Sequence, residues 1–334
     1  MKNVTMADVA EHAKTSKSTV SQFLNKRYEY MSGNTRKRIE VAIEELNYHP
    51  NSVARSLKKK TTNTVGVIVA NILHSFSTHI IRTLETEFNK HGFHTIICNA
   101  DDNPEKERNY IEMLLAKQVD GLIIFPTGEN SDLYEQMQNR NFPVVFMDRK
   151  VDGYAIDTVM LDNYKASELA VDKLVSCNYE RISIVTTSVI RSISPRIERI
   201  EGYRRALKKH ALPIREDYIQ TGDAEHLQAI LEELFQLDYP PEAVLAGNDI
   251  VLIEVLKYLN EKKLSIPKDV AVIGIDEVPF AAFYTPPLTV VEQPKIDMAN
   301  RAAKLLLEKI NEDNGDGKTN VYRMNPELID RNSC

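Results

Sequence analysis

Cysteine is scarce in this chain: among 334 residues there are only three, Cys98, Cys177 and Cys334. They lie far apart and match no metal-ligand spacing, and their odd number argues against a disulfide framework. Long apolar runs are missing too, since no stretch approaches the roughly 18 residues of a membrane-spanning helix. Residues 1–10 carry polar side chains throughout and lack the apolar segment of a secretory signal. We therefore expect a cytoplasmic, reduced protein with no metal, no cofactor and no membrane contact.

The signatures of common enzymes are also absent. The first buried run, Val65–Ala70, is followed by Asn71–Ser77, which has neither the glycines of a dinucleotide-binding turn nor a Walker phosphate loop. No GxSxG or HExxH motif occurs, and the eight histidines are scattered. Because nothing pairs a nucleophile with a base, the sequence favours a sensor over an enzyme.

The net charge of −6 is distributed unevenly along the chain. Residues 1–60 hold 12 Lys and Arg against 6 Asp and Glu, a net charge of +6, whereas the other 274 residues hold 30 against 42, a net charge of −12. Such asymmetry indicates a basic module that meets phosphate and an acidic body that does not. A solvated basic surface would give the same count, so charge alone leaves both interpretations open.

Three short helices are predicted before residue 50. Thr5 opens the first with a capping-box pattern, Ser16 caps a second from Lys17 to about Asn25, and Ser32 or Asn34 caps the third. A tight turn between the first two is typical of a helix-turn-helix, although a plain three-helix bundle has the same apolar pattern. The second helix exposes side chains that can bond base edges or phosphates, namely Lys17, Ser18, Ser21 and Gln22.

The segments Val4–Ala13, Ser18–Asn25 and Thr35–Leu57 resemble the headpiece of the LacI/GalR repressor family. The resemblance implies an all-α DNA-binding headpiece over residues 1–49 and a hinge over residues 50–60. The positions that it assigns to DNA binding are Thr5, Ser16, Lys17, Ser18, Ser21, Gln22, Asn25, Asn51, Val53, Ala54, Arg55 and Leu57.

Two residues depart from the family pattern. Lys14 stands in the turn where the family usually has glycine, and we expect slight strain there because other residues resist positive φ. Gln22 stands where the family usually has arginine. Since arginine favours guanine and glutamine favours adenine, we predict an A·T pair in each half-site where many relatives read G·C.

The hinge segment Asn51–Leu57, which follows Pro50, can form two helical turns. Seven residues are too few for a stable isolated helix, so it needs support. In the resembled family DNA and the partner's hinge helix supply that support, and Leu57 corresponds to an apolar wedge that enters the minor groove. Alternatively, the segment is a plain linker and Leu57 covers the core domain.

From Val65 onward, buried Val/Ile runs alternate with amphipathic segments, which indicates parallel sheets of βαβ units. Because the units are too many for one ordinary sheet, we expect two doubly wound subdomains. The predicted strands are Val65–Ala70, Thr95–Asn99, Gly121–Pro126, Val144–Asp148, Ile182–Thr187, Tyr218–Gln220, Val244–Gly247 and Val270–Ile275. Helices are predicted between most of these strands, such as His79–His91, Glu105–Gln118, Lys165–Ser176, Arg199–His210 and Leu252–Lys262.

This region also resembles the LacI/GalR family, through pieces such as Val119–Ile124, Met147–Arg149, Gly274–Asp276 and Pro326–Arg331. The resemblance implies an α/β core of periplasmic-binding-protein type over residues 61–334. Its N-subdomain would span about 61–160 and 293–322, and its C-subdomain about 161–292 and 323–334. An effector would bind between them, at Asn71, His74, Phe76, Arg149, Arg196, Arg199, Asn248 and Asp276, with Asp148 nearby. Each has a structural alternative: Asp148 could only cap a helix, and Phe76 could be core.

The effector is predicted to be anionic. Many relatives have an aromatic residue after a Gly-Asp pair, where this chain has Ala224, so aromatic stacking is not expected. Arg149, Arg191, Arg196 and Arg199, together with His74, crowd the expected cleft, and arginine suits carboxylates and phosphates. A sugar acid or a sugar phosphate would be an effector of this kind. The segments Lys17–Gln22 and Tyr30–Ser32 resemble regulators of ketodeoxygluconate and pectin-derived sugar acids.

We expect a homodimer on a palindromic operator, because helix-turn-helix proteins usually gain specificity through two-fold symmetry. His74–Glu87 would supply the interface helix, and only three residues follow Arg331, too few for a leucine-heptad tetramerisation segment. The expected function is a transcriptional regulator, most simply a repressor of carbohydrate or sugar-acid catabolic genes, and inducer and corepressor both remain open. A transport solute-binding protein would need an export signal and no basic headpiece. An enzyme fused to a DNA-binding module would turn its sugar over.

Overall fold

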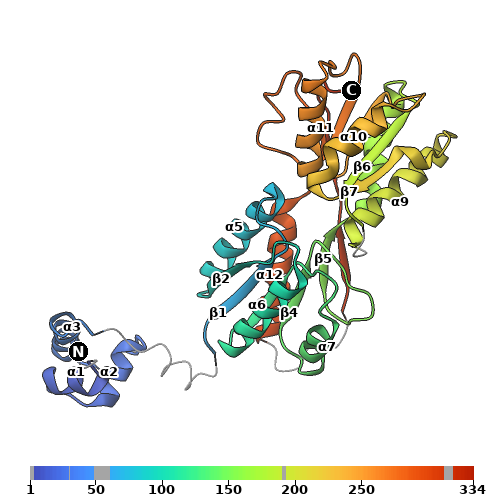
Figure 1. The fold of residues 1–334 in the computed structure, drawn as a ribbon. Coiled ribbons are helices and arrows are strands. Elements are labelled where there is room, and N and C mark those ends of the chain that lie inside the picture. The colour runs from blue at the N-terminus through green and yellow to red at the C-terminus, as the bar shows by residue number, and fades with distance from the viewer. Residues whose placement is uncertain (1–3, 30, 49–60, 190–192, 312–318) are drawn as a thin grey trace. The chain divides into compact units, whose positions relative to one another are not determined.

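The computed structural model describes residues 4–29, 31–48, 61–189, 193–311 and 319–334. The chain forms two compact units, Met1–Thr62 and Asn63–Cys334 (Figure 1). Within the described ranges, no helix combines the length and the apolar character needed to cross a lipid bilayer.

The N-terminal unit contains three helices, α1 (Met6–His12), α2 (Lys17–Leu24) and α3 (Gly33–Glu45). Each begins at a predicted cap. Thr5 and Asp8 form a reciprocal capping box, Ser16 accepts from the Thr19 amide, and Ser32, rather than Asn34, accepts from the Thr35 amide. The small core that the helices share consists of Val9, Ala10, Ala13, Val20, Ile39, Ala42 and Tyr48.

The turn between α1 and α2 contains Lys14 with φ of 49°. This is the left-handed region that the glycine of related sequences would enter without a steric cost. The expectation of positive φ at Lys14 is therefore confirmed, and the caps on either side hold the turn in place.

The C-terminal unit contains two six-stranded sheets with an equivalent strand order. The first has the order β11-β5-β4-β3-β1-β2, and the second the order β12-β10-β9-β8-β6-β7. All neighbouring strands are parallel except β10 and β12. The strands of the first sheet are β1 (Thr64–Val69), β2 (His94–Asn99), β3 (Gly121–Ile124), β4 (Val144–Met147), β5 (Thr158–Leu161) and β11 (Val321–Met324). Those of the second are β6 (Ile182–Thr187), β7 (Ile219–Gly222), β8 (Ala243–Ala246), β9 (Ala271–Ile275), β10 (Thr289–Glu292) and β12 (Glu327–Ile329).

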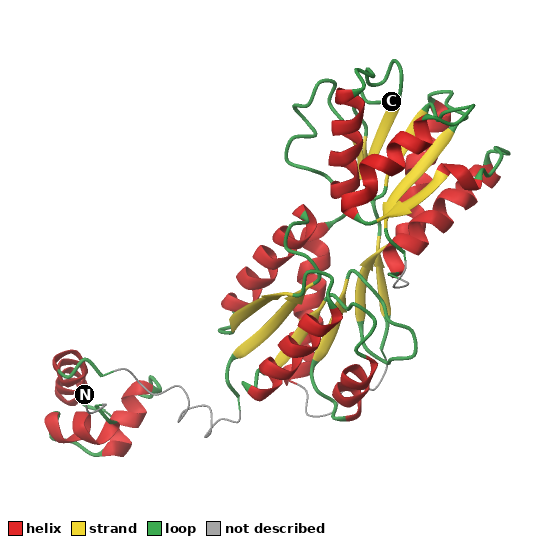
Figure 2. Ribbon diagram, in the orientation of Figure 1, coloured by secondary structure: helices red, strands yellow, loops and turns green. Residues whose placement is uncertain are grey.

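Helices cover both faces of each sheet (Figure 2). In the first, α5 (Ser75–Lys90) and α12 (Lys295–Asn311) share one apolar core, while α6 (Pro104–Ala116) and α7 (Ser131–Asn139) share another. In the second, the pairs are α8 (Asn163–Ser176) with α9 (Ser194–Lys209), and α10 (Leu227–Phe235) with α11 (Asp249–Glu261). Two short 3-10 turns, η1 (Glu216–Tyr218) and η2 (Ala224–His226), flank β7. We call the first sheet with its helices lobe 1, and the second sheet with its helices lobe 2.

The described chain passes between the lobes at three places. It leaves β5 for α8 at Asp162, returns from β10 to α12 at residues 293–294, and leaves β11 for β12 at residues 325–326. Each crossing is short, so the lobes are held together by three neighbouring connections.

The predicted parallel βαβ architecture is confirmed, with corrections in detail. Sequence patterns missed β5, β10, β11 and β12 and the helices α7, α10 and α12. The predicted strand at Tyr218 begins one residue later, because Tyr218 closes the 3-10 turn η1. The helices α5, α8, α9 and α11 begin two to five residues earlier than predicted. Their first turns lack the apolar periodicity that marks a helix in sequence.

Candidate functional site

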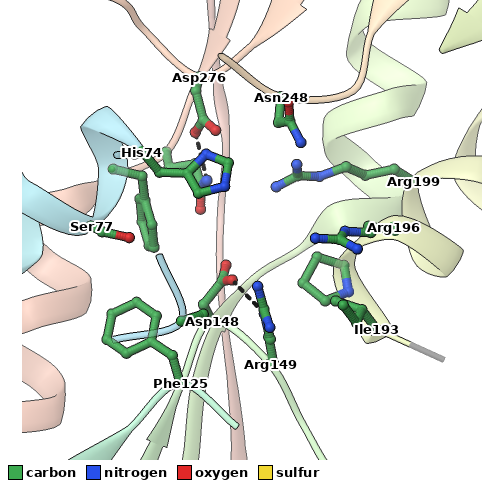
Figure 3. A pocket seen from close by; sticks show the side chains of 14 residues that line it. His74, Ser77, Phe125, Asp148, Arg149, Ile193, Arg196, Arg199, Asn248 and Asp276 are labelled. Atoms are coloured by element: carbon green, nitrogen blue, oxygen red, sulfur yellow. Dashed lines mark hydrogen bonds and ion pairs between the residues drawn. The ribbon is translucent and has the colours of Figure 1, made fainter. Parts of the chain in front are cut away.

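A pocket opens in the C-terminal unit where the two sheets present their strand ends (Figure 3). It holds about 500 Å³ of space free of protein atoms, part of it open to solvent. The residues that line it are Ala70, His74, Phe76, Ser77, Phe125, Asp148, Arg149, Ile193, Pro195, Arg196, Arg199, Asn248, Asp276 and Gln293. Seven of the eight predicted effector residues are among them. Asn71 is not: its Oδ1 accepts a hydrogen bond from the Leu73 amide and shapes the loop after β1.

The topology explains why residues so far apart in sequence meet here. In open parallel sheets, ligands bind beyond the carboxyl ends of the strands. In lobe 1 the lining segments follow β1, β3 and β4; in lobe 2 they follow β8, β9 and β10 and begin α9.

Two aspartates occupy equivalent positions in the two lobes. Asp148 follows β4 with φ of 67°, and Asp276 follows β9 with φ of 93°. These conformations are uncommon for residues other than glycine, and such residues gather at ligand sites because the surrounding fold must hold them there. Both strands lie at the same place in the order of their sheets, so the lobes offer the pocket one carboxyl group each.

Arg149 is buried at the lobe 1 side of the pocket, with only 6% of its surface exposed. Its Nη2 donates to Asp102 Oδ1 at 2.7 Å, and its Nε lies 3.7 Å from Asp148 Oδ2. Burial would raise the pKa of Asp102, but the charge and hydrogen bond of Arg149 lower it below its ordinary range. The Nε and Nη1 of Arg149 make no hydrogen bond to any residue that the structure describes. A buried guanidinium with unused donors is costly unless a ligand or water completes it.

Two further arginines come from α9 in lobe 2. Arg199 is buried and fixed, with Nε donating to Asn163 Oδ1 at 2.8 Å and Nη1 donating to the Gly247 carbonyl at 2.5 Å. Arg196 donates from Nη1 to the Ser188 carbonyl at 2.5 Å. Burial and the charge of Arg149 lower the pKa of Arg196 to about 10. Arg196 therefore remains a cation at neutral pH, in a place where another cation faces it.

The pocket also has a polar group made of Asp276 and Asn248 of lobe 2 and Gln293 of the crossing from β10 to α12. Gln293 donates from Nε2 to Asp276 Oδ1 at 2.6 Å, and its own Oε1 is buried without a hydrogen-bond partner among the described residues. Burial raises the pKa of Asp276, and the charge of Arg199 only partly offsets it. Asn248 caps α11 by accepting from the Val251 amide at 2.9 Å. This side of the pocket offers acceptors to a ligand that carries hydroxyl groups.

His74 links the two lobes at another edge of the pocket. Its Nδ1 lies 2.5 Å from Oδ1 of Asp249, the first residue of α11, and Oδ2 of the same carboxylate accepts from the Ser75 amide at 2.8 Å. Burial would lower the pKa of His74, but the hydrogen bond and charge of Asp249 raise it above 6.5. Burial would likewise raise the pKa of Asp249, and the hydrogen bond and charge of His74 lower it. The carboxylate thus sits at the N-termini of both α5 and α11, which favour negative charge.

In the N-terminal unit, the predicted DNA-contacting residues divide into two groups. Thr5 and Ser16 act as caps, and Asn25 donates from Nδ2 to the Ser21 carbonyl at 2.7 Å. Lys17 and Ser18 are exposed on α2, and Ser21 and Gln22 are partly exposed. Residues four apart on a helix lie on one face, so these four side chains form one polar surface opposite Val20. The predicted hinge residues Asn51, Val53, Ala54, Arg55 and Leu57 lie outside the described residues, as does Arg191.

Comparisons with known proteins agree with this architecture. The model of "Bacterial regulatory proteins, lacI family" matches residues 5–51, and that of "Periplasmic binding proteins and sugar binding domain of LacI family" matches residues 62–325. The chain belongs to the LacI family. It is therefore a DNA-binding transcriptional regulator with a core of the family's sugar-binding type.

Individual LacI family members extend the similarity to the whole chain. The probable HTH-type transcriptional regulator EndR of Paenibacillus polymyxa is 47% identical over 98% of both chains. The HTH-type transcriptional regulator KdgR of Bacillus subtilis (strain 168) is 34% identical over 95% of this chain and 94% of its own. A crystal structure of the Lac repressor dimer bound to operator and the anti-inducer ONPF has a TM-score of 0.85 at 25% identity, over 99% of both chains. The resemblance found in the sequence is confirmed.

Some lining residues of this LacI family member escaped sequence reasoning, namely Ala70, Ser77, Phe125, Ile193, Pro195 and Gln293. Gln293 was missed because β10, which it follows, was not predicted. Asp249 was visible as the acidic neighbour of Asn248, but its partner His74 lies 175 positions away. Ala224 lies in η2 and is not a lining residue, so the pocket receives no aromatic ring from that position.

Proposed function

We propose that this regulator responds to a small anionic sugar derivative, a sugar acid or sugar phosphate, bound between the two lobes. The observation that carries the proposal is Arg149, whose Nε and Nη1 are buried beside the pocket without a hydrogen-bond partner among the described residues. Three arginines line the pocket against two aspartates, and burial raises the pKa of Asp276. The match to the family's sugar-binding domain supports a sugar scaffold.

The proposed contacts divide by chemistry. Arg149, Arg196 and Arg199 would meet the anionic group, while Asn248, Asp276 and the Gln293 carbonyl would accept hydrogen bonds from hydroxyl groups. Phe76 and Phe125, whose rings pack edge to face, form an apolar wall against which a sugar ring can lie. His74 serves the site through Asp249 rather than as a free cation.

Calorimetry tests the effector class. Titration of the full chain with D-galacturonate, D-glucuronate and 2-keto-3-deoxygluconate is expected to give binding, and the matched neutral sugars are expected to give none. Arg149→Gln should abolish that binding, whereas Arg140→Gln, which removes an exposed arginine, should leave it intact. Tight binding of neutral sugars alone would overturn the anionic assignment. We further propose binding without turnover, so the recovered ligand should be chemically unchanged.

We propose that α2 reads the operator through Lys17, Ser18, Ser21 and Gln22, and that residues 50–60 form a hinge whose Leu57 enters the minor groove. The exposed polar face of α2 supports the first part, since base edges are read by such side chains in the major groove. Effector binding would change the lobe arrangement and so the placing of the hinges, a shift between two populations. The regulator would act in the cytoplasm, where chromosomal DNA is, as a repressor of sugar or sugar-acid catabolic genes.

Selection from a random operator library tests the part assigned to Gln22. We expect A·T at the base pair facing residue 22, because a glutamine side chain pairs best with adenine. Gln22→Arg should move the preference at that one position to G·C, and enrichment of G·C by the wild-type protein would contradict the assignment. Adding the effector found by calorimetry to a gel-shift assay then shows whether it releases or recruits the protein.

We also propose that the regulator works as a homodimer. The solved Lac repressor, of the same family, is described as a dimer bound to operator. In this chain Leu73 is 80% exposed, and Ile72 and Ile97 are exposed beside it, where the loop before α5 meets the edge strand β2. A second copy of the chain is the partner that would cover this apolar patch and the adjoining α5.

A further inference from the structure

We propose that the anionic group of the effector binds between Arg149 of lobe 1 and Arg196 of lobe 2, and so clamps the lobes together on that side of the pocket. This rests on the proposed effector site and adds where the charge sits and what it does mechanically. Figure 3 shows both side chains reaching toward the same part of the pocket from opposite lobes.

The lobe 1 half of the clamp is held rigidly. Asp102 fixes one guanidinium nitrogen of Arg149 at 2.7 Å, and Arg149 follows Asp148, whose backbone is set at φ of 67°. The side chain is 6% exposed, yet Nε and Nη1 have no partner among the described residues. Buried, preorganised donors that reach no acceptor among the described residues are the feature expected of a ligand contact.

The lobe 2 half comes from the first turn of α9. Arg196 is the third residue of that helix, so its charge adds to the partial positive charge of the helix N-terminus. The Lys150 amide, next to Arg149, donates to the Ser194 hydroxyl, two residues before Arg196, at 3.0 Å. The two guanidinium-bearing segments are therefore in direct contact across the lobe boundary.

Like charges placed together in a partly buried site repel each other, and an anion between them is attracted by both. The carboxylates that face the pair are Asp102 and Asp148. Asp102 holds Arg149 from behind, and Asp148 stands 3.7 Å from its Nε, beyond hydrogen-bond reach. The pKa of Arg196 is lowered first by burial and then by the charge of Arg149, whereas the charges of Asp102 and Asp148 raise it.

The clamp would act on a boundary that is already joined elsewhere. The contact of Asp249 with His74 and the Ser75 amide needs no effector. On the side of Arg149 and Arg196 the lobes meet through the hydrogen bond from the Lys150 amide to the Ser194 hydroxyl, and an anion between the two guanidinium groups would add a second tie there.

Hydrogen–deuterium exchange of the full-length protein tests the clamp without knowledge of the natural effector. The probes are inorganic phosphate and acetate, each compared with chloride at equal ionic strength. We expect slower exchange at residues 145–150 and at residues 193–199 together, because one anion touches both segments. The protection should be lost in Arg149→Gln and Arg196→Gln and kept in Arg140→Gln. Protection by phosphate alone assigns a phosphate effector, and protection by acetate as well assigns a carboxylate.

Three results would overturn the clamp: no protection by either probe, protection of only one segment, or protection that persists in Arg196→Gln. Should Arg149→Gln fail to fold, Arg196→Gln decides alone, since among the described residues the hydrogen bond of the Arg196 side chain goes to the Ser188 carbonyl. Different results would contradict the clamp and the assignment of the effector class. A sugar acid that binds wild type and both variants equally removes the clamp and keeps the effector class. If phosphate protects both segments but no sugar acid or sugar phosphate binds, the clamp is kept and the effector class is removed.

Discussion

At the scale of single residues, the pocket is defined by which polar groups already have partners. The His74 imidazole and the Asp249 carboxylate satisfy each other across the lobes, and Asp249 also accepts the Ser75 amide. Nε and Nη1 of Arg199 donate to the Asn163 side chain and to the Gly247 carbonyl. Arg149 and Gln293 are left with buried atoms that lack partners among the described residues. The sequence could show that these residue types lie near strand ends. It could not show which side chains bond to each other, because the partners are as far apart in sequence as His74 and Asp249.

The His74–Asp249 pair makes stability depend on pH. Since the folded pKa of His74 lies above 6.5, its contribution is complete below pH 6.5 and is lost as the pH rises through the folded value. The pKa of Asp249 is lowered, so its contribution is present above 3.8 and is lost only as the pH falls through the folded value. Asp249→Asn should cost about 3 kcal/mol near pH 6 and clearly less near pH 8.5.

Urea unfolding of the C-terminal unit across this pH range measures that difference. Asp152→Asn is the matched control, because Asp152 is exposed and its ion pair with Lys150 lies at the surface. A cost for Asp249→Asn that stayed constant with pH would show that the imidazolium is not part of the interaction.

At the scale of elements, the helices that build the pocket begin earlier than their apolar pattern indicates. The first turns of α5, α9 and α11 hold His74-Ser75, Ser194-Pro195-Arg196 and Asn248-Asp249. These residues face the other lobe or the pocket, so they lack the apolar spacing that marked the remainder of each helix. Buried Val/Ile runs predicted eight strands, whereas β11, with two exposed residues among four, gave no such signal. The first turns of the pocket helices were therefore missed together with whole elements such as β5, β10 and α12.

The packing of α8 against α9 depends on one glycine. A Cβ built on Gly202 would lie 2.8 Å from the Tyr164 Cα and closer still to its carbonyl oxygen, which belong to backbone that cannot move aside cheaply. Gly202→Ala should therefore destabilise the C-terminal unit by about 2 kcal/mol. Thermal or urea unfolding measures the loss. Glu201→Ala, an exposed neighbour on the same helix, should stay within about 0.5 kcal/mol of wild type. Equal effects of the two substitutions would argue against close contact between these helices.

At the scale of the whole molecule, the chain combines a basic unit that reads DNA with an acidic two-lobed core that binds a ligand. Its family and architecture could be predicted because the headpiece motifs and the alternation of buried runs are local in sequence. The contacts between the two lobes could not be predicted from the sequence, because they join segments that meet only after both sheets have formed.

A substitution in the apolar patch around Leu73 tests the proposed dimer. Sedimentation of the wild-type protein should give twice the chain mass of 38.0 kDa, and Leu73→Asp should give the single chain mass. Because Leu73 is 80% exposed in the single chain, its replacement should leave the unfolding of the monomer almost unchanged. Tyr239→Asp, at an exposed position on lobe 2, should remain dimeric. A Leu73→Asp protein that is still dimeric and binds operator normally would place the interface elsewhere.

The three short crossings between the lobes have a consequence for how strongly a ligand must bind. Tethered lobes meet at a high effective concentration, so a contact that would be too weak between separate proteins can still hold them together. The length and stiffness of the crossings at Asp162, residues 293–294 and residues 325–326 then set the ligand's apparent dissociation constant together with the pocket itself. Substitutions in these connections offer a way to retune the sensitivity of the regulator while every ligand-contacting side chain stays as it is.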